Sequence, residues 1–290
     1  MKELLVMLPK IIFMGIMSVT VIPYTISGDA QSATYSPGDQ SNLPPKTWID
    51  SDTGHRIIRL TDDPGSIGLY FNVQAYTPDG LDMIYKSRAG IGIVNLATNK
   101  TRLIVKGPVR DIVVGTRTRR VFFMKSESST LYAANLDTGE IRKLVDLPPR
   151  ANIETINADE TLAAGTYIEG NEDDFSDLKV DSSVRETAIR ATKTDMRFNA
   201  HIPIVLFTVD LRSGKTNHLL HSTDWLNHTL FSPTDPTLLM YCHEGDWDKV
   251  DRIWTINTNG SGNRLIHTKS MVGEIAGHEF GGGRWQNNLV

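Results

Sequence analysis

The chain has 290 residues, is 40% hydrophobic and carries a formal net charge of −4 at pH 7. Its length allows one large domain or two small ones, and its mild acidity gives no support to bulk nucleic-acid binding, which requires a basic stripe. A single cysteine, Cys242, excludes an intrachain disulfide framework and a zinc site built from several cysteines.

The first 33 residues have the pattern of a secretory signal peptide. Lys2 and Lys10 flank the start, an uncharged apolar run covers 11–23, and small and polar residues follow as far as Ala33. An uncleaved membrane anchor is the alternative, but the run is shorter than the ~20 residues of a spanning helix. We therefore expect cleavage after Ala30 or Ala33, export to the periplasm or the medium, and no membrane attachment of the remaining chain, 34–290.

From residue 76 onward, a tight turn followed by an apolar strand recurs, and each copy continues into a strand–turn–strand unit. The turn-and-strand copies are 76–85, 116–124, 157–164 and 232–241, and the units that follow them are 93–105, 131–145, 206–220 and 253–267. A period of about 40 residues with four strands is typical of a β-propeller blade. A sandwich or barrel is the alternative, but neither predicts so regular an order. We therefore expect an all-β propeller with about four to five blades encoded.

The third repeat is longer than the others, and its excess lies between Ile168 and Ala200. This stretch begins with acidic residues, and Ser183 with Glu186 forms a capping box that predicts a helix to about Phe198. The insertion is expected either to serve function at a propeller rim or to be a solvated loop.

Polar residues concentrate between Asn227 and Phe280. Alignment of the repeats predicts that His228 and His278 each open the innermost strand of successive blades, at one mouth of the central channel. Arg252 stands where another strand begins, so it can reach the same rim, and His243–Glu244 ends a strand nearby.

A histidine–arginine cluster suits two kinds of chemistry. Neutral imidazoles bind metals, and a histidine base with a neighbouring arginine can remove a proton next to a carboxylate. The alternative is structural: histidines that satisfy strand ends, and an Arg252 paired with Asp248 or Asp251. The chain has no nucleophile elbow, P-loop or H-E-x-x-H motif.

Several segments in their order and spacing resemble one family, the oligogalacturonate lyases, also called family 22 pectate lyases. The resemblance covers roughly 46–280. It rests on the segments 55–61, 157–162, 222–228, 242–245, 251–254 and 277–280.

The resemblance implies a seven-bladed propeller that cleaves short galacturonate oligomers by β-elimination with a divalent metal, typically Mn²⁺. It implies that His278 is the Brønsted base and that Arg252 binds the substrate carboxylate. It further implies that His228, His243 and Glu244 line the sugar cleft. The expected partner is an anionic oligogalacturonide, for which a net-negative chain needs a local basic pocket.

One departure from the family concerns the metal. The family's metal ligands lie beyond the His-Glu-Phe motif, and this chain ends ten residues after Phe280. The codons for the last residues, read one base later, can spell a turn and strand, so we expect a frameshift near Phe280. This chain is then expected to carry no metal site of its own and to have weak or no activity.

The competing hypothesis is a non-catalytic exported propeller that binds protein or sugar on its rim. Such a scaffold has no need of the set His228, His243, Arg252 and His278, which therefore distinguishes the two hypotheses.

Overall fold

The computed structural model describes residues 44–169, 195–246, 250–277 and 279–281, and these residues form an almost entirely β structure. After a small hairpin of β1 (Thr47–Ile49) and β2 (Arg56–Ile58), sixteen strands form four antiparallel sheets of four. This confirms the predicted propeller architecture.

Each sheet is one blade, and its strands follow each other in chain order. Blade 1 has β3 (Ile67–Gly68), β4 (Asp82–Ser87), β5 (Gly90–Asn95) and β6 (Thr101–Lys106). Blade 2 has β7 (Val109–Val114), β8 (Arg120–Lys125), β9 (Thr130–Asn135) and β10 (Ile141–Asp146). Blade 3 has β11 (Asn152–Ile156), β12 (Leu162–Ile168), β13 (Ile204–Asp210) and β14 (Thr216–Ser222). Blade 4 has β15 (Leu226–Phe231), β16 (Leu238–His243), β17 (Ile253–Asn257) and β18 (Arg264–Leu265).

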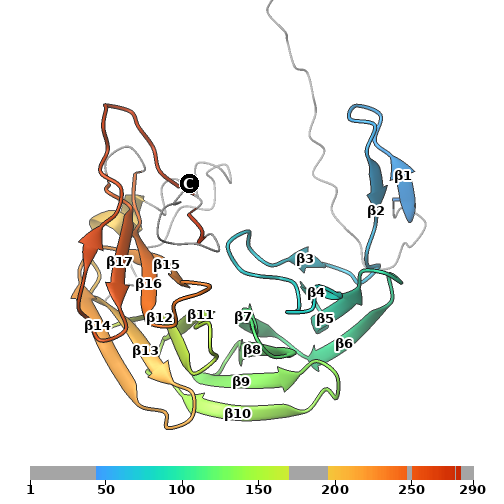
Figure 1. The fold of residues 1–290 in the computed structure, drawn as a ribbon, viewed down its shortest axis with the longest axis horizontal. Coiled ribbons are helices and arrows are strands. Elements are labelled where there is room, and N and C mark those ends of the chain that lie inside the picture. The colour runs from blue at the N-terminus through green and yellow to red at the C-terminus, as the bar shows by residue number, and fades with distance from the viewer. Residues whose placement is uncertain (1–43, 170–194, 247–249, 278, 282–290) are drawn as a thin grey trace, which may run out of the picture. The chain divides into compact units, whose positions relative to one another are not determined.

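The first strand of each blade lies on the inside of the arrangement. Strand β11 contacts both β7 and β15. In Figure 1 the strands β3, β7, β11 and β15 face the inner side, and β6, β10 and β14 lie on the outer side. Strands β7, β11 and β15 are therefore the innermost strands of their blades, and His228, predicted to open such a strand, is the third residue of β15.

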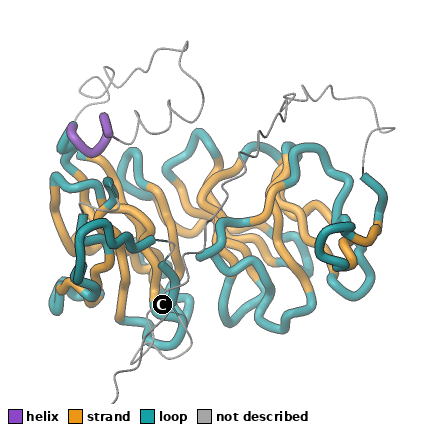
Figure 2. The backbone as a smooth tube through the Cα atoms, turned by 90° about the horizontal axis from the view of Figure 1, so that it is seen from above, coloured by secondary structure: helices purple, strands orange, loops and turns teal. Residues whose placement is uncertain are grey.

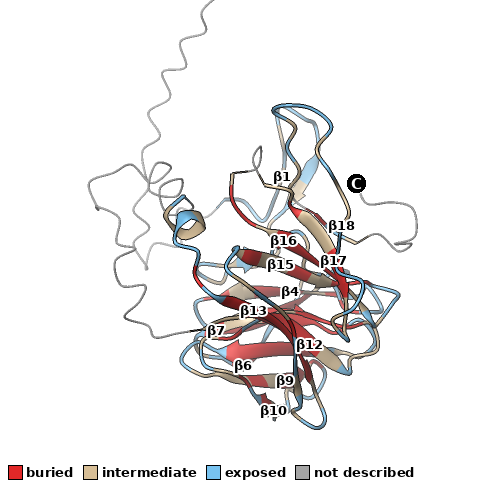
Figure 3. Cartoon of the chain, turned by 90° about the vertical axis from the view of Figure 1, so that its left-hand side faces the viewer, coloured by how far each residue is buried: buried red, intermediate tan, exposed pale blue. Residues whose placement is uncertain are grey.

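Apolar residues hold neighbouring blades together. Three buried clusters each draw on two adjacent blades: Ile84 and Phe123 share one cluster, Phe122 and Phe207 a second, and Leu206 and Tyr241 a third. Figure 3 shows buried residues concentrated along the strands and exposed ones in the loops. The alternating apolar positions of each strand therefore supply the packing between sheets.

The turns between outer strands follow the chemistry that the sequence indicates. Gly139 and Gly214 have φ values of 75° and 74°, a region that glycine enters without steric cost. Asn135 and Asp210 accept backbone N–H bonds from the turn residues that follow them. These hairpins set the register between the third and fourth strands of blades 2 and 3.

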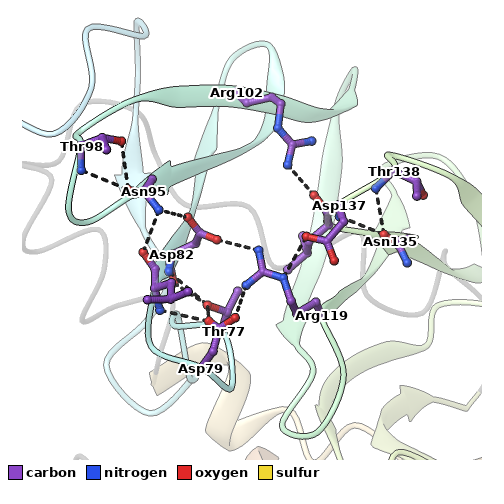
Figure 4. A network of polar contacts seen from close by, with 12 residues as sticks. Thr77, Asp79, Asp82, Asn95, Thr98, Arg102, Arg119, Asn135, Asp137 and Thr138 are labelled. Carbon is purple, nitrogen blue, oxygen red and sulfur yellow. Dashed lines mark hydrogen bonds and ion pairs between the residues drawn. The ribbon is translucent and has the colours of Figure 1, made fainter.

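Polar side chains also connect the blades. Arg119 of blade 2 forms ion pairs with Asp79 and Asp82 of blade 1, at 2.6 Å each, and with Asp137 at 2.9 Å (Figure 4). Between blades 2 and 3, Glu160 Oε1 accepts the backbone N–H groups of Arg117 and Thr118 at 2.8 Å.

Three sequence predictions concern residues at or beyond the limits of the described structure. Residues 195–199 form a short helix, seen in Figure 2, at the end of the predicted one, while the rest of the blade 3 insertion lies outside the described residues. The signal peptide, 1–33, also lies outside them. Within the described chain, no helix has the length and apolar character to cross a membrane.

Candidate active site

The innermost strands of blades 2, 3 and 4 share one irregularity. The register shifts between Arg110 and Val113 in β7, between Ile153 and Thr155 in β11, and between Asn227 and Leu230 in β15. Each shift is a β-bulge, and bulges re-aim side chains next to functional sites. The bulges contain Asp111, Glu154 and His228.

Two of these bulge residues adopt backbone conformations that are uncommon outside glycine. Asp111 has φ 52° and His228 has φ 50°. Such a conformation costs free energy for a side chain as large as histidine, and it persists where the surroundings fix it. The strain at His228 therefore marks its position as one that the fold holds in place.

Each bulge carboxylate bonds to the next blade. Asp111 Oδ2 accepts the backbone N–H of Ile153 at 3.1 Å, and Glu154 Oε2 accepts that of Thr229. These bonds tie neighbouring inner strands together at their bulges.

A chain of charged groups continues from His228 into blade 4. His228 Nε2 lies 3.3 Å from Glu244 Oε2, and Glu244 Oε1 accepts a bond from Arg252 Nη1 at 2.5 Å. Arg252 Nε also donates to Glu279 Oε1 at 3.0 Å, and the Arg252 side chain is only 2% exposed. The predicted residues His228, Glu244 and Arg252 therefore lie in one buried network, and it reaches Glu279, the neighbour of His278.

The network controls protonation of its members. The hydrogen bond to Glu244 raises the pKa of His228 above its usual value, although burial opposes this. Burial disfavours the charged form of Glu244, but bonds from His228 and Arg252 outweigh it and lower the pKa of Glu244 to about 2. At neutral pH, Glu244 is thus an anion held between two cationic or partly cationic groups.

His243 has a different environment. Its ring stacks on Trp254 with centroids 4.9 Å apart, and its Nδ1 lies 3.4 Å from Asp224 Oδ2. Burial lowers the pKa of His243, so the imidazole is neutral at pH 7. His243 therefore contacts Trp254 and Asp224 and lies outside the His228–Glu244–Arg252 network, although Glu244 follows it directly in the chain.

Arg252 stands one residue before β17, where the sequence predicts a strand to begin, but its surroundings were not foreseen. Its guanidinium contacts the carboxylates of Glu244 and Glu279. Asp248, one of the two alternative partners, lies outside the described residues. A substrate carboxylate would be a third anionic neighbour in a place with little solvent access. His278 lies outside the described residues, so its predicted role stays a prediction.

Glu154 borders three neighbouring cavities of about 360, 350 and 330 Å³. Burial raises the pKa of Glu154 to about 7. A carboxyl that titrates near neutrality beside a cavity is typical of functional sites. No sequence motif singled out Glu154 or Asp111. Each nevertheless lies in the innermost strand of its own blade, as His228 does in blade 4.

The described residues contain no cluster of three or more histidine, cysteine or acidic side chains arranged to hold a metal ion. This part of the chain therefore does not by itself fit a manganese centre.

The chain has clear relatives. The family model for oligogalacturonate lyase matches residues 36–285. Oligogalacturonate lyase of Dickeya dadantii (strain 3937) is 25% identical over 242 residues, which are 81% of this chain and 60% of that protein.

Two solved structures are also similar. An oligogalacturonate lyase in complex with manganese superposes with a TM-score of 0.67 at 25% identity, over 81% of this chain and 62% of that one. An oligogalacturonate lyase from Vibrio parahaemolyticus superposes with a TM-score of 0.67 at 26% identity, over 81% of this chain and 61% of that one. The chain thus spans about three-fifths of the length of these relatives. With its four blades and a family match over most of its length, the chain belongs to the oligogalacturonate lyase family.

Proposed function

We propose that this chain acts on short galacturonate oligomers and cleaves them by β-elimination. Family membership supports the reaction class. One observation carries the assignment to this site: Arg252 lies between Glu244 and Glu279. Glu279 follows the proposed base His278 directly in the sequence. A buried arginine with two carboxylates is costly to maintain for stability alone.

The reaction requires removal of the C5 proton, which the adjacent carboxylate of the uronate acidifies. The C4–O bond to the neighbouring sugar then breaks, a double bond forms between C4 and C5, and the departing oxygen takes up a proton from water. In our proposal His278 accepts the proton as a neutral imidazole, and Arg252 offsets the negative charge that develops. His228, His243 and Glu244 line the sugar cleft.

Manganese is the metal of one related structure, and we propose it as the cofactor with which this family acts. When bound, a divalent cation would stabilise the charge that develops on the substrate carboxylate. The described residues of this chain supply no ligand cluster for it.

Lyase activity is tested with the full chain and trigalacturonate, with and without Mn²⁺, by the ultraviolet absorbance of the unsaturated product. We expect slow product formation that His278→Ala reduces by at least about a hundredfold, since a positioned general base contributes 10²–10⁴-fold. His267→Ala, a histidine paired with Glu274 at 2.7 Å, is the matched control and keeps the rate.

Binding of trigalacturonate without any product would contradict the lyase proposal and favour the non-catalytic propeller. An unchanged rate in His278→Ala would contradict the assignment of the base.

We further propose that the chain is exported, on the strength of the charged start, apolar run and small residues of 1–33. N-terminal sequencing of the protein from cells is expected to begin at Gln31 or Thr34. A chain that still begins at Met1 would contradict this proposal.

A further inference from the structure

The elimination involves two proton transfers, and only the first has a residue assigned to it. His278 is the proposed acceptor of the C5 proton, but the departing oxygen must also gain a proton, because a sugar alkoxide is a strong base and a poor leaving group. In a galacturonate, the C5 hydrogen and the C4 oxygen lie on opposite faces of the ring. One side chain therefore cannot serve both atoms, and a proton donor has to approach from the other face.

The fold holds His228 in a fixed position beside a cavity. This residue stands in the bulge of β15 with φ 50°, and it borders the cavity of about 350 Å³. The backbone N–H of the next residue, Thr229, is bonded to Glu154, and the ring of Tyr70 lies 5.8 Å from the imidazole. A side chain fixed in this way is suited to proton transfer, which depends on accurate placement.

Glu244 determines which ring nitrogen of His228 is engaged. Its Oε2 lies 3.3 Å from Nε2, while its Oε1 accepts a bond from Arg252 Nη1 at 2.5 Å. A carboxylate only accepts hydrogen bonds, so Glu244 keeps a hydrogen on Nε2. Among the residues that the structure describes, the other ring nitrogen, Nδ1, has no hydrogen-bond partner. Nδ1 is therefore the atom from which an imidazolium can give a proton away.

Three carboxylates favour the protonated form of His228. The hydrogen bond to Glu244 raises its pKa above the ordinary value, and the charges of Glu279 and Glu154 act in the same direction. Burial opposes them but does not outweigh them. More of His228 is therefore imidazolium near neutral pH than would be the case for a histidine in water.

Other charged groups face the same cavity from blades 1 and 2. Lys86 of β4 lines it, as do Arg110 and Asp111 of β7, which pair with each other at 2.5 Å. The pKa of His228 is raised in the presence of all three.

His243 is not an equivalent donor. Burial lowers its pKa, and its ring stacks on that of Trp254. Of the two histidines, His228 is therefore the one that holds a proton to give.

We propose that His228 is the proton donor of the elimination and that Glu244 positions it. As His278 takes the C5 proton, the electrons of the C–H bond form the C4–C5 double bond. The pair of the C4–O bond leaves with the oxygen, which receives the proton from Nδ1 of His228. The reaction leaves His278 protonated and His228 neutral, and exchange with water restores both. The proton that water supplies thus passes through His228, and this role rests on the proposed function.

The test compares two departing groups on the full chain. Trigalacturonate releases a sugar, whereas a methyl galacturonide that carries a 4-nitrophenyl ether on C4 releases nitrophenolate, a weak base that leaves without a proton. His228→Gln is expected to slow trigalacturonate cleavage at least about a hundredfold, the contribution of a positioned acid, and to keep nitrophenolate release within a few-fold of wild type. His278→Ala slows both, and His218→Gln, an exposed histidine of β14, slows neither. Retained nitrophenolate release also shows that His228→Gln is folded.

The positioning role of Glu244 is measured through the protonation of His228. The pKa from the NMR signal of its imidazole should lie above the ordinary 6.5 in wild type and fall in Glu244→Gln. The rate of trigalacturonate cleavage declines at alkaline pH as the donor loses its proton, and in Glu244→Gln this decline should begin at lower pH. Glu127→Gln, at an exposed carboxylate, changes neither measurement.

The two proposals fail differently. The donor role is overturned if His228→Gln slows both substrates equally or slows neither, or if His228 of the wild type titrates below pH 6.5; product formation then still upholds the lyase proposal. Absence of product from both substrates overturns the lyase proposal and the donor role with it.

Discussion

Two arginines in this chain each bind more than one carboxylate, but in opposite surroundings. Arg119 joins blades 1 and 2 through three aspartates, and its side chain is 28% exposed (Figure 4). Arg252 lies between Glu244 and Glu279 and is 2% exposed. Water and salt screen the first network, whereas the second has lost its hydration and depends on its partners.

This difference separates a structural from a functional use of the same chemistry. An exposed network fixes how two blades meet at little cost, and other contacts could replace it. A buried one costs desolvation free energy, and an apolar core would serve stability equally well. The burial of Arg252 therefore indicates that the position of its charge matters.

The largest expected effect comes from removing the buried arginine. Arg252→Ala leaves Glu279 without its ion-pair partner and Glu244 with His228 alone, and we expect the free energy of unfolding to fall by about 3–5 kcal/mol. Urea unfolding followed by circular dichroism measures this. A loss no greater than that of Arg142→Ala, an exposed arginine, would show that the buried network is not coupled to the fold.

A smaller effect is expected in the pH dependence of stability. The folded-state pKa of Glu244, about 2, lies below its ordinary 4.5, so its ionised form stabilises the fold above pH 4.5 and this stability is lost as the pH falls toward 2. The lowering corresponds to on the order of 3 kcal/mol, at about 1.4 kcal/mol per pH unit.

Glu244→Gln is therefore expected to flatten the curve of unfolding free energy between pH 5 and 2, measured by urea titration at each pH. Glu127→Gln, an exposed control, keeps the wild-type slope. Parallel curves for wild type and Glu244→Gln would refute the role of this carboxylate.

The smallest effect is expected at the partly exposed network around Arg119. Arg119→Ala should lower the free energy of unfolding by about 1 kcal/mol, because two of its three aspartate partners, Asp79 and Asp137, are exposed and such ion pairs contribute little. The difference from wild type should shrink further in 1 M salt, where the screening length is about 3 Å. A loss as large as that of Arg252→Ala, or one insensitive to salt, would remove the distinction between the two networks.

The repeats made the blades predictable from sequence. Strands β4, β8, β12 and β16 lie where turns such as Thr77–Gly80 predict them, because turn chemistry and strand pattern are local properties. In blade 4 the predicted last strand, 264–267, is shorter in the structure, where β18 ends at Leu265.

The site was only partly predictable. The unusual residue types of the His228, His243 and Arg252 segments drew attention to them, and the resemblance to a family supplied roles. Asp111 and Glu154 are common residue types in ordinary strands. Their importance arises from bonds between blades 2, 3 and 4, a long-range property that no local pattern contains.

The repeated bulge has a consequence for how this architecture can diversify. At each bulge the register of the inner strand shifts, so one residue is left unpaired in the ladder. Asp111, Glu154 and His228 thus occupy corresponding positions in blades 2, 3 and 4, outside the three buried apolar clusters. A substitution there changes the polar contacts of one blade, among them the bonds to Ile153 and Thr229, without redesign of the core.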